Sequence, residues 1–242
     1  LNNHYVIMCT QNGVVKKTCL EAYSRPRQNG INAIGIREGD MLLEAKLTDG
    51  NSDVMIAANS GKAIRFHESK VRSMGRSASG VRGILLSGDK DKVVGMICVN
   101  NLDSHVLVVS ENGYGKRSDI DAYRITNRGG KGVKTINITD KTGKLIAIKN
   151  VVDENGLMII NKSGVMIRMN VESMRVMGRA TQGVKLINLK EGDQISSVAK
   201  VEIDENADSE LTVEEDNNEN RDNESSVNKI DDNTQNSNSE SN

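Results

Sequence analysis

Lysine and arginine recur at equivalent places of a repeated segment, and they are the residues of this sequence that could do chemistry. One set follows a short glycine turn, a second lies in a long polar loop, and a third follows a downstream glycine. The three sets are Lys16, Lys17, Lys62, Arg65, Lys116, Arg117 and Arg168; Arg25, Arg27, Arg72, Arg76, Arg124, Arg128, Lys131, Arg175 and Arg179; and Arg82, Lys134 and Lys185. Cations repeated at a fixed period would form a belt on a curved rim, and such a belt would bind a polyanion that bends around it.

The charge of the chain is divided between two regions. Residues 1–200 carry 30 basic and 19 acidic residues, a net charge of +11, whereas residues 201–242 carry 2 basic and 14 acidic residues, a net charge of −12. The overall charge of −1 hides this division. The acidic segment is too polar to offset the entropy of folding, so we expect a folded body over 1–200 and a disordered acidic tail over 201–242.

Glycines set the period of the repeat. A first glycine recurs at spacings of 48, 52 and 51 residues, and a second at spacings of 50, 52 and 51. The first set is Gly13, Gly61, Gly113 and Gly164, and the second is Gly30, Gly80, Gly132 and Gly183. A period near 50 residues is the length of one propeller-type blade of four strands.

Each repeat has the same order of elements, as the second one illustrates. It contains two predicted strands, Val54–Ala58 and Lys62–Phe66, joined by a turn at Gly61, and then two further strands over 80–86 and Val93–Val99. We expect an all-β, propeller-like body of four four-stranded blades over approximately 1–50, 51–101, 102–153 and 154–200. Short helical turns are expected near Leu20–Tyr23 and Ser118–Tyr123. A single blade cannot bury its apolar face alone, so neighbouring blades must pack together.

Enzyme, metal and membrane signatures are missing from the sequence. His4, His67 and His105 show no pairing with a nucleophile, and the three cysteines lack metal-ligand spacing. The glycine-rich segment 127–132 lacks the full phosphate-binding pattern, and no apolar run is long enough to cross a membrane. The chain begins at Leu1 and enters a strand at once, which suggests a piece of a longer protein. We expect a cytoplasmic, non-catalytic segment with no cofactor of its own.

Composition narrows the polyanion to duplex DNA. Aromatic residues make up 2% of the chain, too few for the stacking platforms of a single-strand binder. No recognition helix or zinc finger is present to read the major groove. The remaining possibility is contact with the backbone of bent duplex DNA.

The body closely resembles the C-terminal domain of DNA gyrase A, the β-pinwheel. The stretches that carry the resemblance are 12–18, 61–66, 74–76, 80–84, 112–117, 131–133 and 176–184, among them Gly80-Val-Arg-Gly-Ile84 and Val176-Met-Gly-Arg-Ala-Thr-Gln-Gly-Val184. The resemblance implies a domain that wraps double-stranded DNA around its basic rim and so lets the enzyme introduce negative supercoils.

The resemblance also implies which parts are absent. The four repeats resemble the last four of six blades, so the family's Arg/Gly-rich box, which lies in the first blade, is not here. Segment 127–132 resembles that box but occupies a later blade. The implied partners are the gyrase A N-terminal domain, which carries the DNA-cleaving tyrosine, and gyrase B, in an A2B2 holoenzyme that uses ATP and Mg. Two alternatives remain: the gyrase A-like subunit of topoisomerase IV, and a propeller-type scaffold that binds proteins.

The charge division predicts competition between the acidic tail and DNA. A flexible segment of 42 residues has a root-mean-square span of roughly 35–40 Å and could reach much of the rim. Truncation after Lys200 should tighten DNA binding, and the gain should shrink as salt rises because screening weakens the competition. DNA affinity measured across a salt series checks this, and equal affinity at every salt concentration would contradict it.

Overall fold

The computed structural model describes residues 3–202, which form one compact all-β unit. Residues 1–2 and 203–242 are outside the described residues, and the predicted disordered tail therefore lies outside them from residue 203 onward. The last strand, β15 (Ile195–Glu202), runs two residues beyond the predicted end of the body, and Glu202 pairs with Asn155. A truncation that removes the tail without shortening β15 therefore ends at Glu202.

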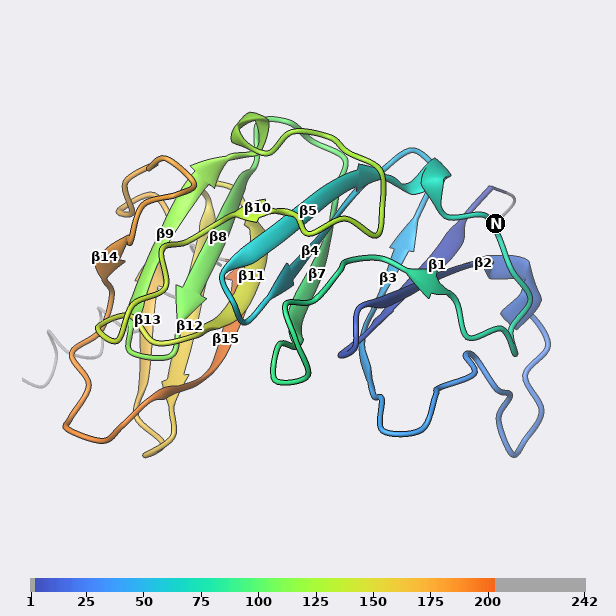
Figure 1. Cartoon of the computed structure of the whole chain (residues 1–242), viewed down its shortest axis with the longest axis horizontal. Helices are drawn as coiled ribbons and strands as arrows, with labels where there is room; N and C mark the ends of the chain where they lie inside the picture. Colours follow the sequence, from blue (N-terminus) through green and yellow to red (C-terminus); the bar gives the residue numbers. More distant parts are fainter. Residues whose placement is uncertain (1–2, 203–242) are drawn as a thin grey trace, which may run out of the picture. The chain divides into compact units, whose positions relative to one another are not determined.

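Four antiparallel sheets make up the body (Figure 1). The first sheet has the order β3 (Leu42–Thr48), β1 (Tyr5–Thr10), β2 (Val14–Cys19) and β6 (Val81–Arg82). The second has the order β10 (Val133–Lys134), β5 (Lys62–His67), β4 (Asp53–Ala58) and β7 (Val93–Val99). The third has the order β11 (Leu145–Val151), β8 (His105–Ser110), β9 (Tyr114–Asp119) and β14 (Val184–Lys185). The fourth has the order β13 (Met166–Asn170), β12 (Asn155–Asn161) and β15.

The sheets are not contiguous segments of sequence, because the second, third and fourth repeats each give a short strand to the repeat before them. β6 of the second repeat pairs with β2 of the first, β10 pairs with β5, and β14 pairs with β9. We call β6, β10 and β14 the exchanged strands. The third strand expected at 80–86 is thus only two residues long, and it belongs to the preceding sheet.

The glycine before each exchanged strand is required by a close backbone contact. A Cβ on Gly132 would lie 2.5 Å from the carbonyl oxygen of Ala63, and Gly132 has a φ of +71°. Gly80 and Gly183 approach Val15 and Gly115 in the same way, at 2.6 Å. No larger residue fits there, because the exchanged strand enters the sheet against the backbone of the hairpin.

The fourth sheet differs from the predicted four-stranded blade. It has three strands, and among the described residues no exchanged strand pairs with the outer edge of β13. An exchanged strand always comes from the repeat that follows, and no fifth repeat is described. The all-β repeat fold is confirmed, but within residues 3–202 the fourth sheet has one strand fewer than predicted.

The hydrophobic cores lie between neighbouring sheets. In β4, Val54 and Ile56 pack into the core shared with the first sheet, whereas Met55 and Ala57 pack into the core shared with the third. Successive side chains of a strand point to opposite faces, so a strand buried on both faces needs a continuous apolar run. This explains why the central strands do not alternate between apolar and polar residues.

Helical structure among the described residues is limited to three 3₁₀ turns, η1 (Leu20–Tyr23), η2 (Glu68–Lys70) and η3 (Ile120–Ala122). Two of them match the turns expected from sequence, and η2 is the equivalent turn of the second repeat. Each turn ends a hairpin and starts the long loop that leads to an exchanged strand.

We predict that Gly132→Ala lowers the free energy of unfolding by about 1–3 kcal/mol more than Gly192→Ala. Both glycines have positive φ, +71° and +78°, but only Gly132 lacks room for a Cβ. The difference between the two variants in urea denaturation isolates the close contact from backbone strain. Equal losses in the two variants would contradict the requirement for glycine at the exchanged strand.

Candidate nucleic-acid interface

The predicted cations divide into three groups by exposure. Ten are exposed, four are half-buried and five are buried. The exposed group is Arg25, Arg27, Arg72, Arg82, Arg124, Lys131, Lys134, Arg168, Arg175 and Lys185; the half-buried group is Lys62, Arg76, Arg128 and Arg179; and the buried group is Lys16, Lys17, Arg65, Lys116 and Arg117.

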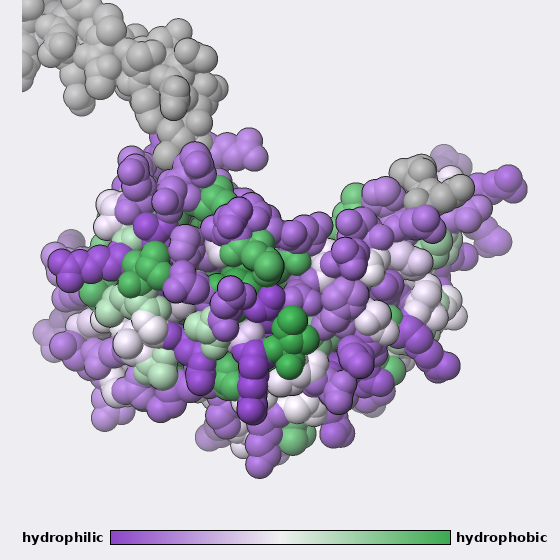
Figure 2. Space-filling view, turned by 90° about the horizontal axis from the view of Figure 1, so that it is seen from above, coloured by the Kyte–Doolittle hydropathy of each residue, from purple (hydrophilic) through white to green (hydrophobic). Residues whose placement is uncertain are grey.

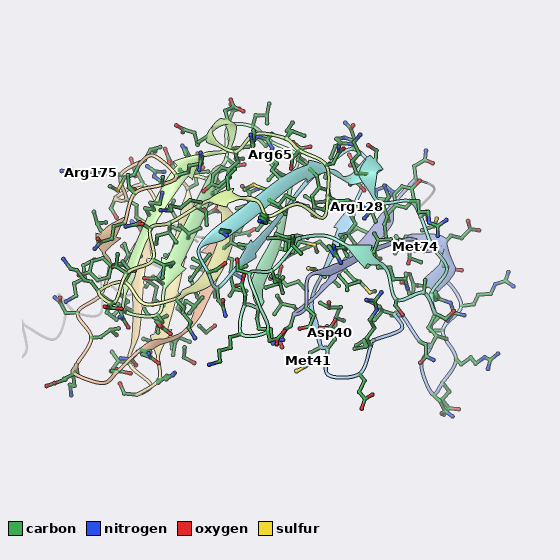
Figure 3. All side chains as sticks on the ribbon, in the orientation of Figure 1. Asp40, Met41, Arg65, Met74, Arg128 and Arg175 are labelled. Atoms are coloured by element: carbon green, nitrogen blue, oxygen red, sulfur yellow. The ribbon has the colours of Figure 1, made fainter. Side chains whose placement is uncertain are left out.

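Two rows of exposed cations repeat along the outer side of the body. The loop row comprises Arg72, Arg124 and Arg175, each directly before a residue that bridges to the hairpin of the preceding repeat. The exchange row comprises Arg82, Lys134 and Lys185, each the second residue of an exchanged strand. In Figure 3, Arg128 and Arg175 lie on the loops of successive repeats, away from the turn that carries Asp40 and Met41.

Three predicted DNA contacts are instead buried ion-pair centres, which corrects their assignment to the surface. Lys17, Arg65 and Arg117 occupy the same place in successive hairpins, and all three are less than a tenth exposed. Their acidic partners are Glu68, Asp53 and Asp153, respectively. Desolvated cations of this kind are stable only when they are fully paired, so they are not available to phosphate groups.

The buried arginines also fasten the loop of the next repeat. Arg65 donates from Nη1 to the carbonyl oxygens of Ile120 at 2.9 Å and Tyr123 at 3.2 Å, and Arg117 donates from Nε to the carbonyl oxygen of Met174 at 2.6 Å. Their own backbone carbonyls accept at 2.8 Å from Thr126 and Met177 of the same loops. The cations of the loop row therefore lie on loops whose backbone is hydrogen-bonded to the preceding hairpin.

Glu68 is a residue that the sequence interpretation missed. Its carboxylate is fully buried and accepts from the backbone nitrogen of Ser52 at 2.7 Å and the hydroxyl of Thr48 at 2.9 Å, besides pairing with Lys17 at 2.9 Å. Its only signal in the sequence is an acidic residue directly after the apolar strand β5, which resembles an ordinary turn position.

Lys16 and Lys116 are buried beneath the loops, which also corrects their assignment as surface contacts. Lys16 donates to the backbone carbonyls of Ala33 at 2.5 Å and of Arg76, and Lys116 donates to that of Gly178 at 2.5 Å. Burial lowers the pKa of Lys16, and burial together with the charge of Arg179 lowers the pKa of Lys116 to about 7. Both lysines hold the loop backbone from below.

The half-buried arginines of the loops connect adjacent repeats. Arg128 donates from Nε to the carbonyl of Lys70 at 2.9 Å and from Nη1 to that of Arg82 at 3.1 Å, and Arg179 donates to the carbonyl of Lys134 at 2.8 Å. Each guanidinium group therefore links its loop to the exchange row of the preceding repeat. These arginines align the two rows as well as adding charge to the surface.

The glycine-rich segment 127–132 crosses the preceding exchanged strand. The nitrogen of Gly129 donates to the carbonyl of Gly83 at 2.6 Å, and Gly130 accepts from Leu85 at 2.9 Å. Arg124 and Lys131 line a small hollow of about 240 Å³ beside this segment. The hollow is open, basic and part of the same outer surface.

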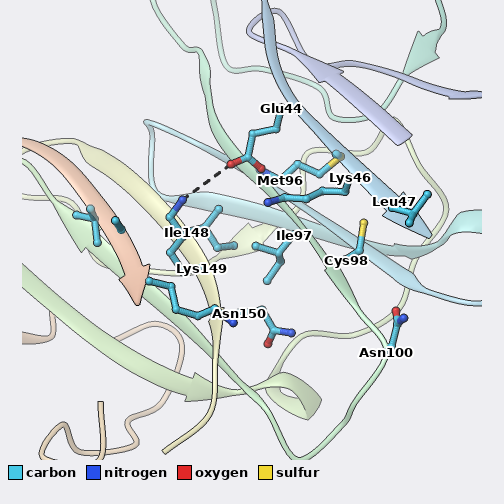
Figure 4. Close-up of a pocket in the computed structure, with 13 residues that line it drawn as sticks. Glu44, Lys46, Leu47, Met96, Ile97, Cys98, Asn100, Ile148, Lys149 and Asn150 are labelled. Atoms are coloured by element: carbon cyan, nitrogen blue, oxygen red, sulfur yellow. Dashed lines mark hydrogen bonds and ion pairs between the residues drawn. The ribbon is translucent and has the colours of Figure 1, made fainter. Parts of the chain in front are cut away.

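A larger cavity on the inner side is the main alternative site. It has a volume of about 530 Å³ and is lined by residues of β3, β7, β11 and β15, including the ion pair between Lys149 and Glu44 at 3.9 Å (Figure 4). Its lining mixes acidic, basic, amide, thiol and apolar side chains, and burial raises the pKa of the Cys98 thiol to about 12. Its strands form the sheet edge away from the exchanged strands that carry the exchange row.

The described residues hold no group of three or more His, Cys, Asp or Glu placed to bind a metal ion. Within the same part of the chain, no helix is long and apolar enough to cross a membrane. Burial raises the pKa of Cys9 and raises that of Cys98 to about 12, so these two thiols stay protonated and unreactive. Figure 2 shows a mainly hydrophilic face with separate apolar patches.

The strand-exchanged, propeller-like arrangement defines the β-pinwheel class of protein. A family model described as "DNA gyrase C-terminal domain, beta-propeller" matches residues 4–49, 52–100, 104–151 and 157–202. The chain therefore belongs to the DNA gyrase A C-terminal domain family.

Relatives and solved structures agree with this family. The DNA gyrase A protein of Chlamydia pneumoniae is 43% identical over 215 residues, and that of Staphylococcus aureus (strain MRSA252) is 44% identical over 218 residues. Each alignment covers 88% of this chain but only 26% and 24% of the relative, so the chain spans about a quarter of their length.

Two solved structures have a similar fold. The C-terminal domain of DNA topoisomerase IV gives a TM-score of 0.78 at 25% identity, covering 83% of this chain and 62% of that one. A DNA gyrase A C-terminal domain gives 0.74 at 23% identity, covering 83% and 67%.

We predict that Lys116→Met removes part of the pH dependence of stability. The folded-state pKa of about 7 lies below the ordinary 10.5, so between these values the unfolded chain binds a proton that the folded chain does not. Burial of Lys116 therefore lowers the free energy of unfolding of the wild type most below pH 7, and this loss disappears as pH rises through 10.5. Relative to Lys116→Met, wild type should gain up to about 1.4 kcal/mol per pH unit in this window.

Urea denaturation between about pH 6 and about pH 10 checks this expectation. The exposed Lys190→Met is the matched control, and its difference from wild type should stay constant with pH. A constant difference for Lys116→Met would contradict a depressed pKa at this position.

Proposed function

We propose that the described body is a DNA-wrapping module that binds the backbone of bent duplex DNA along its outer side. The observation that carries this proposal is the pair of cation rows, Arg72/Arg124/Arg175 and Arg82/Lys134/Lys185, exposed at equivalent positions of three successive repeats. Phosphate groups also repeat at a fixed spacing, so a periodic array of cations can neutralise them over a long path.

The anchoring of the loops supports a wrapped path. The loop row is held by hydrogen bonds from Arg65 and Arg117 to backbone carbonyls, so the cations of one repeat keep a fixed place relative to the next. A rigid, curved array favours DNA that follows its curvature, and the bending energy then depends on the deformability of the sequence. Base readout is not needed, and the large aromatic side chains Tyr123 and Phe66 are buried.

Membership of the family supports a role for this module in a larger enzyme. We propose that the chain acts within a DNA gyrase as the C-terminal part of gyrase A, joined to the gyrase A N-terminal domain and assembled with gyrase B as A2B2. Catalytic residues, ATP and Mg would belong to those other parts, and this segment would bind DNA without catalysing a reaction. Such an assembly would introduce negative supercoils and act in the bacterial cytoplasm.

Two other functions fit less well. Topoisomerase IV has a domain of similar fold, but the relatives with 43–44% identity are gyrase A proteins. A protein-binding scaffold would need a concentrated apolar or aromatic surface. The exposed apolar residues are instead spread over several repeats, for example Leu47, Leu102 and Ile125.

We predict that Arg72→Gln, Arg124→Gln and Arg175→Gln together weaken DNA binding on all duplex sequences alike. Each lost phosphate contact should flatten the slope of log K against log salt by roughly 0.9, giving a change of up to about 2.7. These three arginines suit the test because the half-buried arginines also connect repeats. Fluorescence anisotropy with two unrelated duplexes across a salt series measures both quantities.

The matched control removes the same charge from the inner side. Lys46, Lys149 and Lys200 line the inner cavity, and their replacement by Gln should leave the salt slope nearly unchanged. Equal effects of the two triple variants would mean that net charge alone drives binding, which would overturn the outer path.

A further inference from the structure

Two loops of the outer side present an apolar side chain directly after a cation. Ile125 follows Arg124 and is 58% exposed, and Val176 follows Arg175 and is 43% exposed. Ile125 lies in the third repeat, with a described repeat on each side, so its exposure does not come from the end of the array. Single exposed apolar residues are common on protein surfaces, but these two recur at the same place of successive repeats.

The backbone beneath these side chains is fixed by the preceding hairpin. Ile125 forms a parallel bridge with Arg65, and Val176 forms the same kind of bridge in the next repeat. On the two sides of Ile125, the carbonyl of Tyr123 accepts from Nη1 of Arg65 at 3.2 Å, and the nitrogen of Thr126 donates to the carbonyl of Arg65 at 2.8 Å. Branching at Cβ restricts χ1 of isoleucine and valine. A stiff side chain on a fixed backbone loses little entropy when a partner buries it.

The second repeat shows that the fold does not require an apolar residue at this place. Ser73 is the equivalent residue there, and it is exposed and follows the loop-row cation Arg72. Its backbone has the same anchor, a parallel bridge to Lys17, and the nitrogen of Met74 donates to the carbonyl of Lys17 at 2.8 Å. Serine and isoleucine therefore occupy the same backbone geometry, and the apolar side chain contributes to contacts outside the body.

The charge around these side chains favours DNA as the partner. Loops 123–132 and 174–183 contain no acidic residue, and five cations lie on them: Arg124, Arg128, Lys131, Arg175 and Arg179. A DNA strand alternates phosphate groups with deoxyribose, whose carbon–hydrogen edges are apolar and lie directly beside each phosphate. A cation followed by an apolar side chain matches a phosphate followed by a sugar.

We propose that Ile125 and Val176 pack against deoxyribose of the bound duplex, while Arg124 and Arg175 neutralise the adjacent phosphate groups. This inference rests on the outer DNA path proposed above, to which it adds an apolar contact in two repeats. Such a contact removes apolar surface from water and releases no counterions, so its contribution to affinity does not depend on salt. It also carries no sequence information, since every nucleotide has the same sugar.

Substitutions at the equivalent positions test the contact in both directions. Ile125→Ser and Val176→Ser introduce the residue that the second repeat already has, and each should weaken DNA binding about three- to tenfold at every salt concentration. Ser73→Ile adds the apolar contact to the second repeat and should tighten binding by a similar factor. Leu102→Ser is the matched control, because Leu102 is 62% exposed but precedes Asp103 in the turn between β7 and β8.

Fluorescence anisotropy across a salt series measures affinity and salt slope on two duplexes, one of G·C pairs and one of A·T pairs. The serine variants should shift the line of log K against log salt without changing its slope, and equally on both duplexes. Calorimetry at several temperatures should show a less negative heat capacity of binding for Ile125→Ser than for wild type, because less apolar surface is buried. Circular dichroism checks that the variants are folded.

Unchanged affinity of both serine variants, with the salt slope of wild type intact, would overturn the apolar contact and leave the outer DNA path standing. A loss confined to the A·T duplex would also overturn it, because thymine methyl groups would then be the partner. An equal loss in Leu102→Ser would show that the effect is not specific to the loops. A wild type without a salt slope would overturn the outer path itself.

Discussion

The close approach of each exchanged strand to the hairpin before it is the contact on which the rest of the structure depends. Gly80, Gly132 and Gly183 lie so near a backbone carbonyl that no side chain fits. The exchanged strand that follows each glycine completes the sheet of the preceding repeat. Because the cores lie between sheets, loss of one exchanged strand exposes apolar surface in two repeats. The stability of such an array is approximately the sum of the stabilities of the single repeats and of the interfaces between neighbouring repeats. Here each exchanged strand belongs to such an interface, because it pairs with the sheet of the preceding repeat.

The buried cations fix the position of each repeat relative to the next. Lys17, Arg65 and Arg117 each pair with a carboxylate, and the two arginines also bond to backbone carbonyls of the following loop. Burying an ion pair costs desolvation energy that its attraction only partly returns, so the stability gained is small. Arginine's planar group can bind several acceptors at once, which suits it to holding a loop in one conformation. The exposed arginines of the loop row are thereby placed by the fold rather than by their own flexible side chains.

Much of the fold could be predicted from the sequence, but the division of the cations could not. The paired glycines mark real turns with positive φ, and the apolar runs between them are strands. The exchange of strands left no local signal, because Val81–Arg82 has the same pattern whether it pairs within its own repeat or with the one before. Lys16 and Lys17 resemble surface residues by composition. The carboxylate that pairs with Lys17 belongs to Glu68, 51 residues downstream, and the backbone carbonyls that accept from Lys16 lie 17 and 60 residues downstream, at Ala33 and Arg76. Burial of a charge is decided by such distant partners, which a local pattern cannot contain.

The direction of exchange also explains why the two ends of the array are not alike. Every described exchanged strand comes from the following repeat, so within residues 3–202 the last hairpin pairs with no exchanged strand and segment 30–36 of the first repeat pairs with no hairpin. The hydrogen bonds of Arg65 and Arg117 have the same direction, from a hairpin to the loop of the next repeat, so they fix the rotation of one repeat relative to its neighbour. The spacing between cation rows follows from that rotation. A polyanion that bound the outer side would have to follow a curvature that the backbone contacts impose, and its contacts with the cation rows would have to repay the bending energy.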